Sequence, residues 1–324
     1  MVKILLAGTY PAGTLEKLRR ELPDNEIKTV ADQETYNRTE YGEVMVVRSL
    51  KTTAAALAPK KDLKAVIKWG AGYDSVDIEA AGKQGVSVSN TPGVNAYSVA
   101  ELAVTLMLSC GRALVQQNTL THDGVWDRKQ YVERMTTLSR KTVGIIGGGN
   151  IGRRVASEVQ SFGAEVIYYD AFRLSPETEK AYGMRFVSLD ELVRTSDVIS
   201  VHVPLLDSTR HLLGAEEIAK MKKNVIVVNT SRGGIIDDKA LYEALKEGRI
   251  SSAGLDCVED EDLSGNPLAK LENVIITPHL GGTSNDLADE MIPRIAGMIR
   301  KFEESGTMDH VVNSKFLAPA KAAV

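Results

Sequence analysis

The stretch Val143-Gly-Ile-Ile-Gly-Gly-Gly-Asn-Ile-Gly152 decides the fold of this chain, because an apolar strand pattern runs directly into glycines spaced Gly-x-Gly-x-x-Gly. Gly147 allows the tight turn, Gly149 lets the backbone approach a pyrophosphate, and Gly152 lets the following helix pack closely on the strand. The helical pattern Ile151–Phe162 follows at once. Its N-terminus presents free N–H groups and the positive end of the helix dipole to phosphates. The stretch therefore predicts a Rossmann-type dinucleotide site.

The second part of this prediction concerns the choice of dinucleotide. The next predicted strand, Glu165–Asp170, ends in an acid 18 residues after Gly152. An Asp at this place accepts hydrogen bonds from both ribose hydroxyls of NAD and repels the additional phosphate of NADP. Arg173 is close in sequence and leaves the preference partly open. We expect NAD as the cofactor.

Short β-rich runs alternate with helical patterns along nearly the whole chain, which is typical of parallel sheets built from right-handed crossovers. The predicted strands are Val2–Gly8, Glu26–Val30, Val44–Arg48, Ala65–Trp69, Val86–Ser89, Val143–Gly147, Glu165–Asp170, Val198–Val203, Val225–Asn229, Ser252–Leu255 and Val274–Thr277. The pattern predicts an α/β protein with two lobes, which separate in the turn-rich stretch Asn90–Asn95. The last helical pattern, Thr283–Glu304, contains Pro293, and we expect this proline to kink or end it.

The composition excludes several other classes of protein. A net charge of −4 offers no basic footprint for a nucleic acid. Cys110 and Cys257 are too few for a disulfide framework, and without a histidine cluster at ligand spacing they predict no metal site. The most apolar stretch, Val99–Val115, is interrupted by Glu101 and Arg112, so we expect a buried or interface helix there and no membrane span. We expect a cytoplasmic protein.

The late strands supply candidates for chemistry on a keto acid, which requires a cation for the carboxylate and an acid for the carbonyl oxygen. Arg232 follows the strand Val225–Asn229, and the carboxyl end of a parallel strand is where such folds bind ligands. His279 follows the run Val274–Thr277 and precedes two glycines, a setting that the other four histidines lack. The partner of this histidine would come from the acidic run Glu259–Asp262, and spacing alone does not choose among its four acids.

Several motifs, in order from about Arg48 to Gly282, resemble the D-isomer-specific 2-hydroxyacid dehydrogenase family, in its phosphoglycerate dehydrogenase-like and 2-keto-acid reductase branch. The motifs are Gly70–Asp77, Thr91–Gly93, Ser98–Glu101, Gly124–Trp126, the glycine fingerprint, His202–Pro204, Asn229–Gly233, Gly254–Asp256 and Pro278–Gly282. The resemblance implies two doubly wound parallel-sheet lobes. One is a Rossmann NAD-binding domain over 96–282, and the other is a flavodoxin-like substrate domain made of 1–95 and 283–324. It also implies a homodimer, because Gly124–Trp126 looks like part of the family's dimer arm.

The resemblance assigns roles to individual residues. Arg232 would bind the substrate carboxylate, and His279 would be the acid in reduction and the base in oxidation. Glu261, five residues after the Asp of the Leu-Asp motif, would be the acid that bonds the imidazole. The implied cofactor contacts, besides the fingerprint glycines and Asp170, are Asn150 and Ile151 at the pyrophosphate, Val203 and Pro204 at the adenine, Thr209 near the phosphates, Thr230 near the nicotinamide, Asp256 at its carboxamide, and Gly281.

The implied substrate contacts are the backbone N–H groups of Ala71 and Gly72, which would form a nest for the carboxylate, and Arg48. Arg48 and Lys68 either meet a second anion on the substrate or are solvated at strand ends. The expected reaction is reversible hydride transfer between NAD(H) and C2 of a small 2-keto or 2-hydroxy acid. Hydroxypyruvate, glyoxylate, pyruvate-like acids and 3-phosphoglycerate are all open as substrates.

Two alternative functions are also open. The first is a phosphite-type dehydrogenase of the same superfamily, and the second is a non-enzymatic NAD-sensing scaffold. Formate dehydrogenases resemble the same pattern but carry Gln in place of the acid that Glu261 supplies, so Glu261 argues against that reaction.

Overall fold

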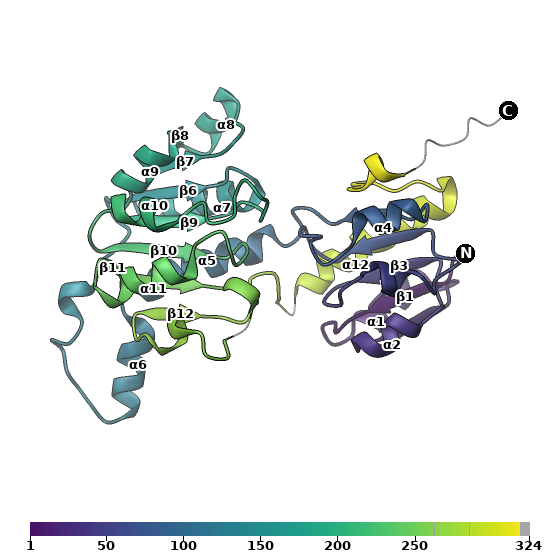
Figure 1. Cartoon of the computed structure of the whole chain (residues 1–324), viewed down its shortest axis with the longest axis horizontal. Helices are drawn as coiled ribbons and strands as arrows, with labels where there is room; N and C mark the ends of the chain where they lie inside the picture. The colour runs from purple at the N-terminus through teal and green to yellow at the C-terminus, as the bar shows by residue number, and fades with distance from the viewer. Residues whose placement is uncertain (262, 285, 318–324) are drawn as a thin grey trace. The chain divides into compact units, whose positions relative to one another are not determined.

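The computed structural model describes residues 1–261, 263–284 and 286–317 (Figure 1). The chain divides into two compact units. Unit 1 consists of Met1–Asn95 and Thr283–Val324, and unit 2 is Ala96–Gly282. Each unit is built on a parallel sheet of its own, which confirms the α/β fold class predicted from the alternation of strands and helices.

Unit 1 contains a five-stranded parallel sheet in the order β2-β1-β3-β4-β5. The strands are β1 (Ile4–Ala7), β2 (Ile27–Val30), β3 (Val44–Val47), β4 (Ala65–Lys68) and β5 (Ser87–Asn90). The helices are α1 (Thr14–Glu21), α2 (Gln33–Arg38), α3 (Ala54–Leu57), α4 (Ile78–Lys83), α12 (Leu287–Ser305) and the 3-10 turn η4 (Ser314–Phe316). The strand order reverses at β1, which has β2 on one side and β3 on the other. Doubly wound sheets bind ligands at the carboxyl ends beside such a reversal.

The strands of unit 1 are apolar because a parallel sheet is covered on both faces. Every residue of β1, β3 and β4 is buried. Met45 and Val47 alternate with their neighbours along β3 and pack with Tyr36 and Leu57, which come from α2 and α3. The continuous Val, Ile and Leu runs in the sequence are therefore the core of this unit.

Helix α12 excludes one of the two effects predicted for Pro293. It continues from Leu287 to Ser305 although Pro293 lies inside it, so the helix does not end at the proline. A proline this near the N-terminus removes one intrahelical hydrogen bond in the second turn. Burial of the helix's apolar face outweighs that loss, and the Arg300 guanidinium fixes the far end by donating to the Glu21 carboxylate at 2.7 Å.

Unit 2 contains a seven-stranded parallel sheet in the order β12-β11-β10-β9-β6-β7-β8. The strands are β6 (Thr142–Ile146), β7 (Glu165–Tyr169), β8 (Met184–Phe186), β9 (Val198–Val201), β10 (Val225–Asn229), β11 (Ile250–Leu255) and β12 (Val274–Ile276). The helices are α5 (Ala96–Gly111), α6 (Leu114–His122), α7 (Asn150–Gln160), α8 (Pro176–Ala181), α9 (Leu189–Thr195), α10 (Ala215–Lys220) and α11 (Asp238–Lys246), with 3-10 turns η1 (Val132–Arg134), η2 (Glu259–Glu261) and η3 (Pro267–Lys270).

Helices cover both faces of this sheet and create two cores. Val225 and Val227 of β10 point into one core, where they meet residues of α9, α10 and α11. Ile226 and Val228 point to the opposite face and pack with residues of α5 and α7. This two-residue alternation between two apolar layers explains why the strand is hydrophobic at every position.

All eleven strands predicted from the sequence are present, with ends within two residues of the prediction. Strand β8 was not predicted, because three residues at the edge of a sheet give almost no periodicity. The predicted buried helix over the apolar stretch 99–115 is confirmed by α5, which carries ten buried residues. Among the described residues, no single helix is long and apolar enough to cross a membrane, and α5 and α6 pass that test only as a pair bent by 62°.

The segment that follows α5 stands away from the sheet of unit 2 (Figure 1). It consists of α6 and the chain up to η1, and we call residues 113–135 the arm. Helix α6 buries none of its residues. Leu114, Val115, Val125 and Trp126 of the arm are all exposed, Trp126 to 79%. The arm therefore presents apolar side chains that no described residue covers.

Candidate active site

The predicted site residues of unit 2 gather at one edge of its sheet. The turns after β6, β7, β9, β10, β11 and β12 all leave the carboxyl edge, because every strand is parallel. These turns carry the glycine fingerprint, Asp170, Val203, Arg232, Asp256 and His279. The strand order reverses at β6, which has β7 on one side and β9 on the other. The carboxyl edge beside such a reversal is where doubly wound sheets bind dinucleotides.

Close contacts determine the shape of the glycine turn after β6. Gly147 has a left-handed φ of 107°, and a Cβ there would lie 2.6 Å from the carbonyl oxygen of His202. A Cβ on Gly152 would lie 2.0 Å from the carbonyl oxygen of Gly147, so α7 packs directly on the turn. Gly149 differs, because a Cβ there would meet nothing within 4 Å. Its open side can admit a ligand to the backbone.

The N-terminus of α7 also suits an anion. Its N-cap residue is Gly149, which has no side chain to bond the N–H groups of the first turn. These N–H groups and the positive end of the dipole favour a phosphate. Asn150 and Ile151 are the first two helical residues, and the Asn150 side chain accepts a hydrogen bond from Arg153 at 2.8 Å. Their predicted contact with the pyrophosphate would thus run through the backbone.

Asp170, at the end of β7, is oriented by two backbone groups. Its Oδ2 accepts from the N–H of Gly148 at 2.7 Å, and its Oδ1 accepts from the N–H of Phe172 at 3.0 Å. The carboxylate is therefore held against the glycine turn itself. Each carboxylate oxygen can accept a further hydrogen bond, which leaves capacity for two ribose hydroxyls.

The turn after β9 lies beside the glycine turn. The side chain of Val203 would be 3.0 Å from a Cβ on Gly147. Thr209 closes this second turn, because its hydroxyl donates to the carbonyl oxygen of Pro204 at 2.6 Å and accepts from the N–H of Leu206 at 2.8 Å. Val203 and Pro204 are thus placed near the dinucleotide fingerprint, and the contact of Thr209 with phosphates stays a prediction.

Arg232 lies in the turn after β10, and the neighbouring Asn229 shapes that turn. Asn229 Oδ1 accepts from the N–H of Ser231 at 3.0 Å and from its hydroxyl at 2.7 Å, while Nδ2 donates to the carbonyl oxygen of Arg232 at 2.8 Å. A Cβ on Gly233 would lie 1.9 Å from the carbonyl oxygen of Val258, so this turn packs against the loop that follows β11. Arg232 itself is half-buried.

The sequence analysis did not foresee the supporting role of Asn229. The signal was available, because an Asn followed two residues later by Ser at the end of a buried strand is typical of an Asx turn. The side-chain carbonyl of such an Asn replaces a backbone acceptor and fixes the direction in which the chain leaves the strand.

Asp256, at the end of β11, is buried and holds the loop that carries His279. Its Oδ1 accepts from the hydroxyl of Thr277 at 2.5 Å and from the N–H of Leu280 at 2.8 Å. Its Oδ2 accepts from the N–H of Gly281 at 2.7 Å. Asp256 and Gly281 were predicted as cofactor contacts, and that prediction is not tested by these bonds. The bonds show a further role for both residues in supporting the His279 loop.

A short polar contact joins the two predicted proton-transfer residues. Nδ1 of His279 lies 2.5 Å from Oε1 of Glu261. Both residues have a left-handed φ, 55° for His279 and 51° for Glu261. Glu259, from the same acidic run, lies 3.2 Å from His211 instead, and Asp262 is outside the described residues. The carboxylate accepts from Nδ1, so the other ring nitrogen, Nε2, is the one available for proton exchange.

Thr230, predicted near the nicotinamide, is buried, and its hydroxyl has no hydrogen-bond partner among the described residues. A buried hydroxyl without a partner costs free energy, so a ligand atom at this place would stabilise it. Together with the open side of Gly149, the uncapped α7 and the oriented Asp170, this orphaned group fits a bound NAD molecule along the carboxyl edge.

The predicted substrate residues Arg48, Ala71 and Gly72 lie in unit 1. Nη1 of Arg48 donates to the carbonyl oxygen of Thr9 at 2.6 Å, and Nη2 donates to the hydroxyl of Thr283 at 3.0 Å. The Lys68 ammonium donates to the carbonyl oxygen of Arg48. Both cations are therefore bound to protein oxygens beside the reversal of the unit 1 sheet, which differs from a solvated strand end.

Ala71 and Gly72 follow β4 in a loop that side chains tie down. The side-chain amide of Asn90 donates to the carbonyl oxygen of Ala71 at 2.6 Å, and the N–H of Gly70 donates to the hydroxyl of Thr91 at 2.7 Å. No described residue accepts from the N–H groups of Ala71 and Gly72. A pair of such N–H groups is what an anion nest requires.

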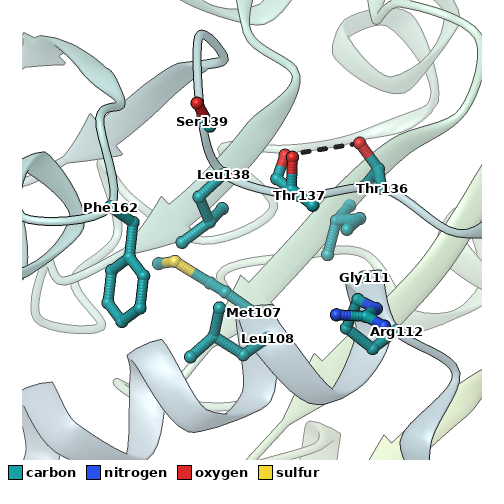
Figure 2. Close-up of a pocket in the computed structure, with 10 residues that line it drawn as sticks. Met107, Leu108, Gly111, Arg112, Thr136, Thr137, Leu138, Ser139 and Phe162 are labelled. Carbon is teal, nitrogen blue, oxygen red and sulfur yellow. Dashed lines mark hydrogen bonds between the residues drawn. The ribbon is translucent and has the colours of Figure 1, made fainter.

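A separate hollow of about 320 Å³ lies between the end of α5 and the chain before β6 (Figure 2). Its lining includes Met107, Leu108, Leu138, Phe162 and Ile226. The side chains of Met107 and Phe162 point toward one another in this hollow (Figure 2). None of the predicted catalytic or cofactor residues lines it, and its surface is mainly apolar.

Comparison with known proteins gives one family match. The family described as "D-isomer specific 2-hydroxyacid dehydrogenase, NAD binding domain" matches residues 104–281. The D-3-phosphoglycerate dehydrogenase of Methanocaldococcus jannaschii is 39% identical over 316 residues, which cover 97% of this chain and 60% of that protein. The hydroxypyruvate reductase of Thermotoga maritima is 44% identical over 246 residues, which cover 75% of this chain and 78% of that protein.

Among solved structures, a glyoxylate reductase from Paecilomyes thermophila is similar, with a TM-score of 0.85 and 30% identity. The similarity covers 97% of this chain and 98% of that one. The chain thus spans three fifths of the M. jannaschii protein and nearly all of the glyoxylate reductase.

Proposed function

Since this chain belongs to the D-isomer-specific 2-hydroxyacid dehydrogenase family, we propose that it catalyses NAD-dependent, reversible reduction of a small 2-keto acid to its D-2-hydroxy acid. The observation that carries this proposal is the 2.5 Å contact between His279 and Glu261. It lies at the same carboxyl edge as Arg232 and the dinucleotide fingerprint. A cation, an oriented acid and a nucleotide site at one edge are the parts that the reaction requires.

Bound NADH supplies a hydride to C2 of the substrate. The residues of the chain bind the substrate and move the proton. Arg232 binds the carboxylate through its planar fork of N–H donors. Nε2 of His279 donates a proton to the carbonyl oxygen as that oxygen gains negative charge, and in the oxidative direction it accepts the proton from the hydroxyl.

Glu261 acts on this step through the imidazole. Its carboxylate accepts from Nδ1, which selects the ring orientation and stabilises the positive charge that His279 carries before donating. Glutamine at position 261 would offer only a neutral oxygen to the same nitrogen. The acid therefore supports proton transfer to a carbonyl oxygen, a step that oxidation of formate does not contain.

The hydrogen bonds of two cations in unit 1, Arg48 and Lys68, favour an unphosphorylated substrate. Arg48 follows β3 and Lys68 ends β4, three residues before Ala71, and both cations donate to protein oxygens. A substrate phosphate would have to compete with those bonds. We therefore propose hydroxypyruvate or glyoxylate as the substrate class, in line with the names of two of the similar proteins. The second candidate is 3-phosphoglycerate, on which the M. jannaschii relative is named.

The experiment is a spectrophotometric assay of NADH oxidation with glyoxylate, hydroxypyruvate, pyruvate and 3-phosphohydroxypyruvate. We expect the first two to give the highest kcat/KM. A preference for the phosphorylated acid would move the assignment to the second candidate. If NADH binds but no keto acid is reduced, phosphite oxidation is tested next, and failure there leaves the NAD-sensing scaffold.

We further propose that the protein is a homodimer held by the arm. The arm exposes Leu114, Val115, Val125 and Trp126, and burial of such side chains is the main favourable term in association. The change Trp126→Asp should convert the dimer into monomers, as measured by light scattering. A wild-type protein that is monomeric at micromolar concentration would contradict the proposal.

A further inference from the structure

The loop after β7 contains a cation next to the acid that is proposed to bind the ribose. Asp170 and Arg173 are three residues apart in this loop, which leads into α8. An arginine at such a place is suited to the 2′-phosphate of NADP, because its fork binds phosphate through two parallel hydrogen bonds. The preference for NAD therefore depends on what Arg173 does in the folded chain.

Arg173 forms a bidentate ion pair with Glu179 of α8. Its Nε donates to Oε1 of Glu179 at 2.8 Å, and its Nη2 donates to Oε2 at 3.0 Å. The same fork that would bind a phosphate is thus engaged by a carboxylate. The guanidinium also lies over the ring of Phe186, 5.5 Å from its centroid, which holds it against the edge strand β8.

Glu179 is itself fixed, so the pair is more than a chance contact between two mobile side chains. The hydroxyl of Tyr168 donates to Oε1 of Glu179 at 2.8 Å and accepts from the N–H of Leu174 at 2.9 Å. Tyr168 is fully buried, and the Glu179 side chain is only 13% exposed. The acid is therefore anchored to the core by a buried tyrosine, whereas the Arg173 side chain is 60% exposed.

We propose that Glu179 is a specificity-determining residue, which excludes NADP by holding the Arg173 guanidinium away from the position of a 2′-phosphate. This inference rests on the proposed function, in which Asp170 binds the ribose hydroxyls. Asp170 repels the phosphate directly, and Glu179 removes the cation that would offset the repulsion. The two acids act on the same discrimination by different routes.

The test compares four variants by the affinity of NADH and NADPH, measured without substrate from the change in nicotinamide fluorescence on binding. The variants are Glu179→Gln, Arg173→Ala, the double variant Arg173→Ala/Glu179→Gln, and Glu177→Gln as the matched control. Glu177 lies on the same helix and is exposed, so its replacement removes the same charge and leaves Arg173 paired. Glutamine at 179 keeps an oxygen that can accept from Tyr168.

We expect Glu179→Gln to lower the Kd of NADPH by at least about 10-fold, the gain of roughly one charge-assisted hydrogen bond, with the Kd of NADH changed by less than about 2-fold. Arg173→Ala alone should leave the affinity for NADPH unchanged, because the arginine is already engaged. The double variant should lose the gain seen in Glu179→Gln.

Three outcomes would overturn the proposal. They are no gain in Glu179→Gln, an equal gain in Glu177→Gln, and a gain that persists in the double variant. Unchanged thermal unfolding would show that each variant is folded. Failure of the proposed function is a separate result, because it would appear as a wild-type protein that reduces no keto acid in the NADH-oxidation assay, whereas these binding measurements contain no substrate.

Discussion

The change Asp256→Asn probes how the acid at the end of β11 supports the proposed proton donor. The carboxylate accepts three hydrogen bonds, from Thr277, Leu280 and Gly281, and it is 2% exposed. Asparagine has nearly the same shape but offers only one acceptor oxygen. In either orientation of the amide, its NH₂ group faces a backbone N–H that cannot accept a hydrogen bond.

The expected magnitude follows from the number of bonds affected. One charge-assisted bond is lost, which costs about 1.5–3 kcal/mol, and one buried N–H is left opposite another donor, which costs about 1–3 kcal/mol. The lower part of their combined range, about 3 kcal/mol, corresponds to roughly 100-fold, since about 1.4 kcal/mol is a factor of ten. These bonds hold the loop that carries His279, so their loss should displace the imidazole. We therefore expect kcat of the variant to fall by about this factor.

The assay measures kcat, the Kd of NADH and the free energy of unfolding for Asp256→Asn beside two variants of Thr277. Thr277→Val removes one of the three bonds and should lower kcat less than Asp256→Asn does. Thr277→Ser keeps the hydroxyl and should retain the wild-type kcat. A variant Asp256→Asn with wild-type kcat and wild-type stability would refute the reasoning. A loss confined to NADH affinity would instead support the carboxamide contact predicted from the sequence.

Three further predictions concern the acid, the glycine turn and the pH dependence of stability. His279→Ala should lower kcat by orders of magnitude with the Kd of NADH nearly unchanged, and retained turnover would exclude it as the proton donor. Gly149→Ala should leave the fold intact and weaken NADH binding, because the added Cβ meets open space. Gly152→Ala should destabilise the protein, because its Cβ would lie 2.0 Å from a carbonyl oxygen. Equal thermal unfolding of the two variants would contradict this. Burial lowers the pKa of Lys60 to about 8, below the unfolded value of about 10.4. The unfolded chain then binds more protons between these values, so the free energy of unfolding should rise from pH 8 to pH 10.4, and Lys60→Met should lack that rise in chemical denaturation.

Much of the fold could be predicted because parallel strands are buried on both faces. The run Val225–Asn229 is hydrophobic at four successive positions, and the structure places a strand at the same bounds. Strand β8 has one fully buried residue, Met184, so its three residues give no such signal. The fingerprint glycines could be assigned individually because each meets a different steric demand. The close contacts at Gly147 and Gly152 agree with the tight turn and the helix packing expected there, and the approach of Gly149 to a pyrophosphate stays a prediction.

The site was less predictable where it depends on which groups meet in space. Four acids in the run Glu259–Asp262 were equivalent by spacing, and only the resemblance to a family selected Glu261. In the structure Glu259 is 3.2 Å from His211, and Glu261 is 2.5 Å from His279. Both glutamates belong to the turn η2, and the direction of a side chain in a short 3-10 turn does not follow from the sequence.

The backbone of the proposed acid and its partner explains why the site needs so much support. Glu261 and His279 both adopt left-handed φ values, which are costly for residues with a Cβ. Such conformations persist only where the surrounding structure fixes them. The three bonds of Asp256 fix the loop of His279, and the packing of Gly233 on Val258 fixes the chain that enters η2. Both side chains are half-exposed, yet these buried polar and glycine contacts hold them at hydrogen-bonding distance. A proton donor requires such fixed positioning.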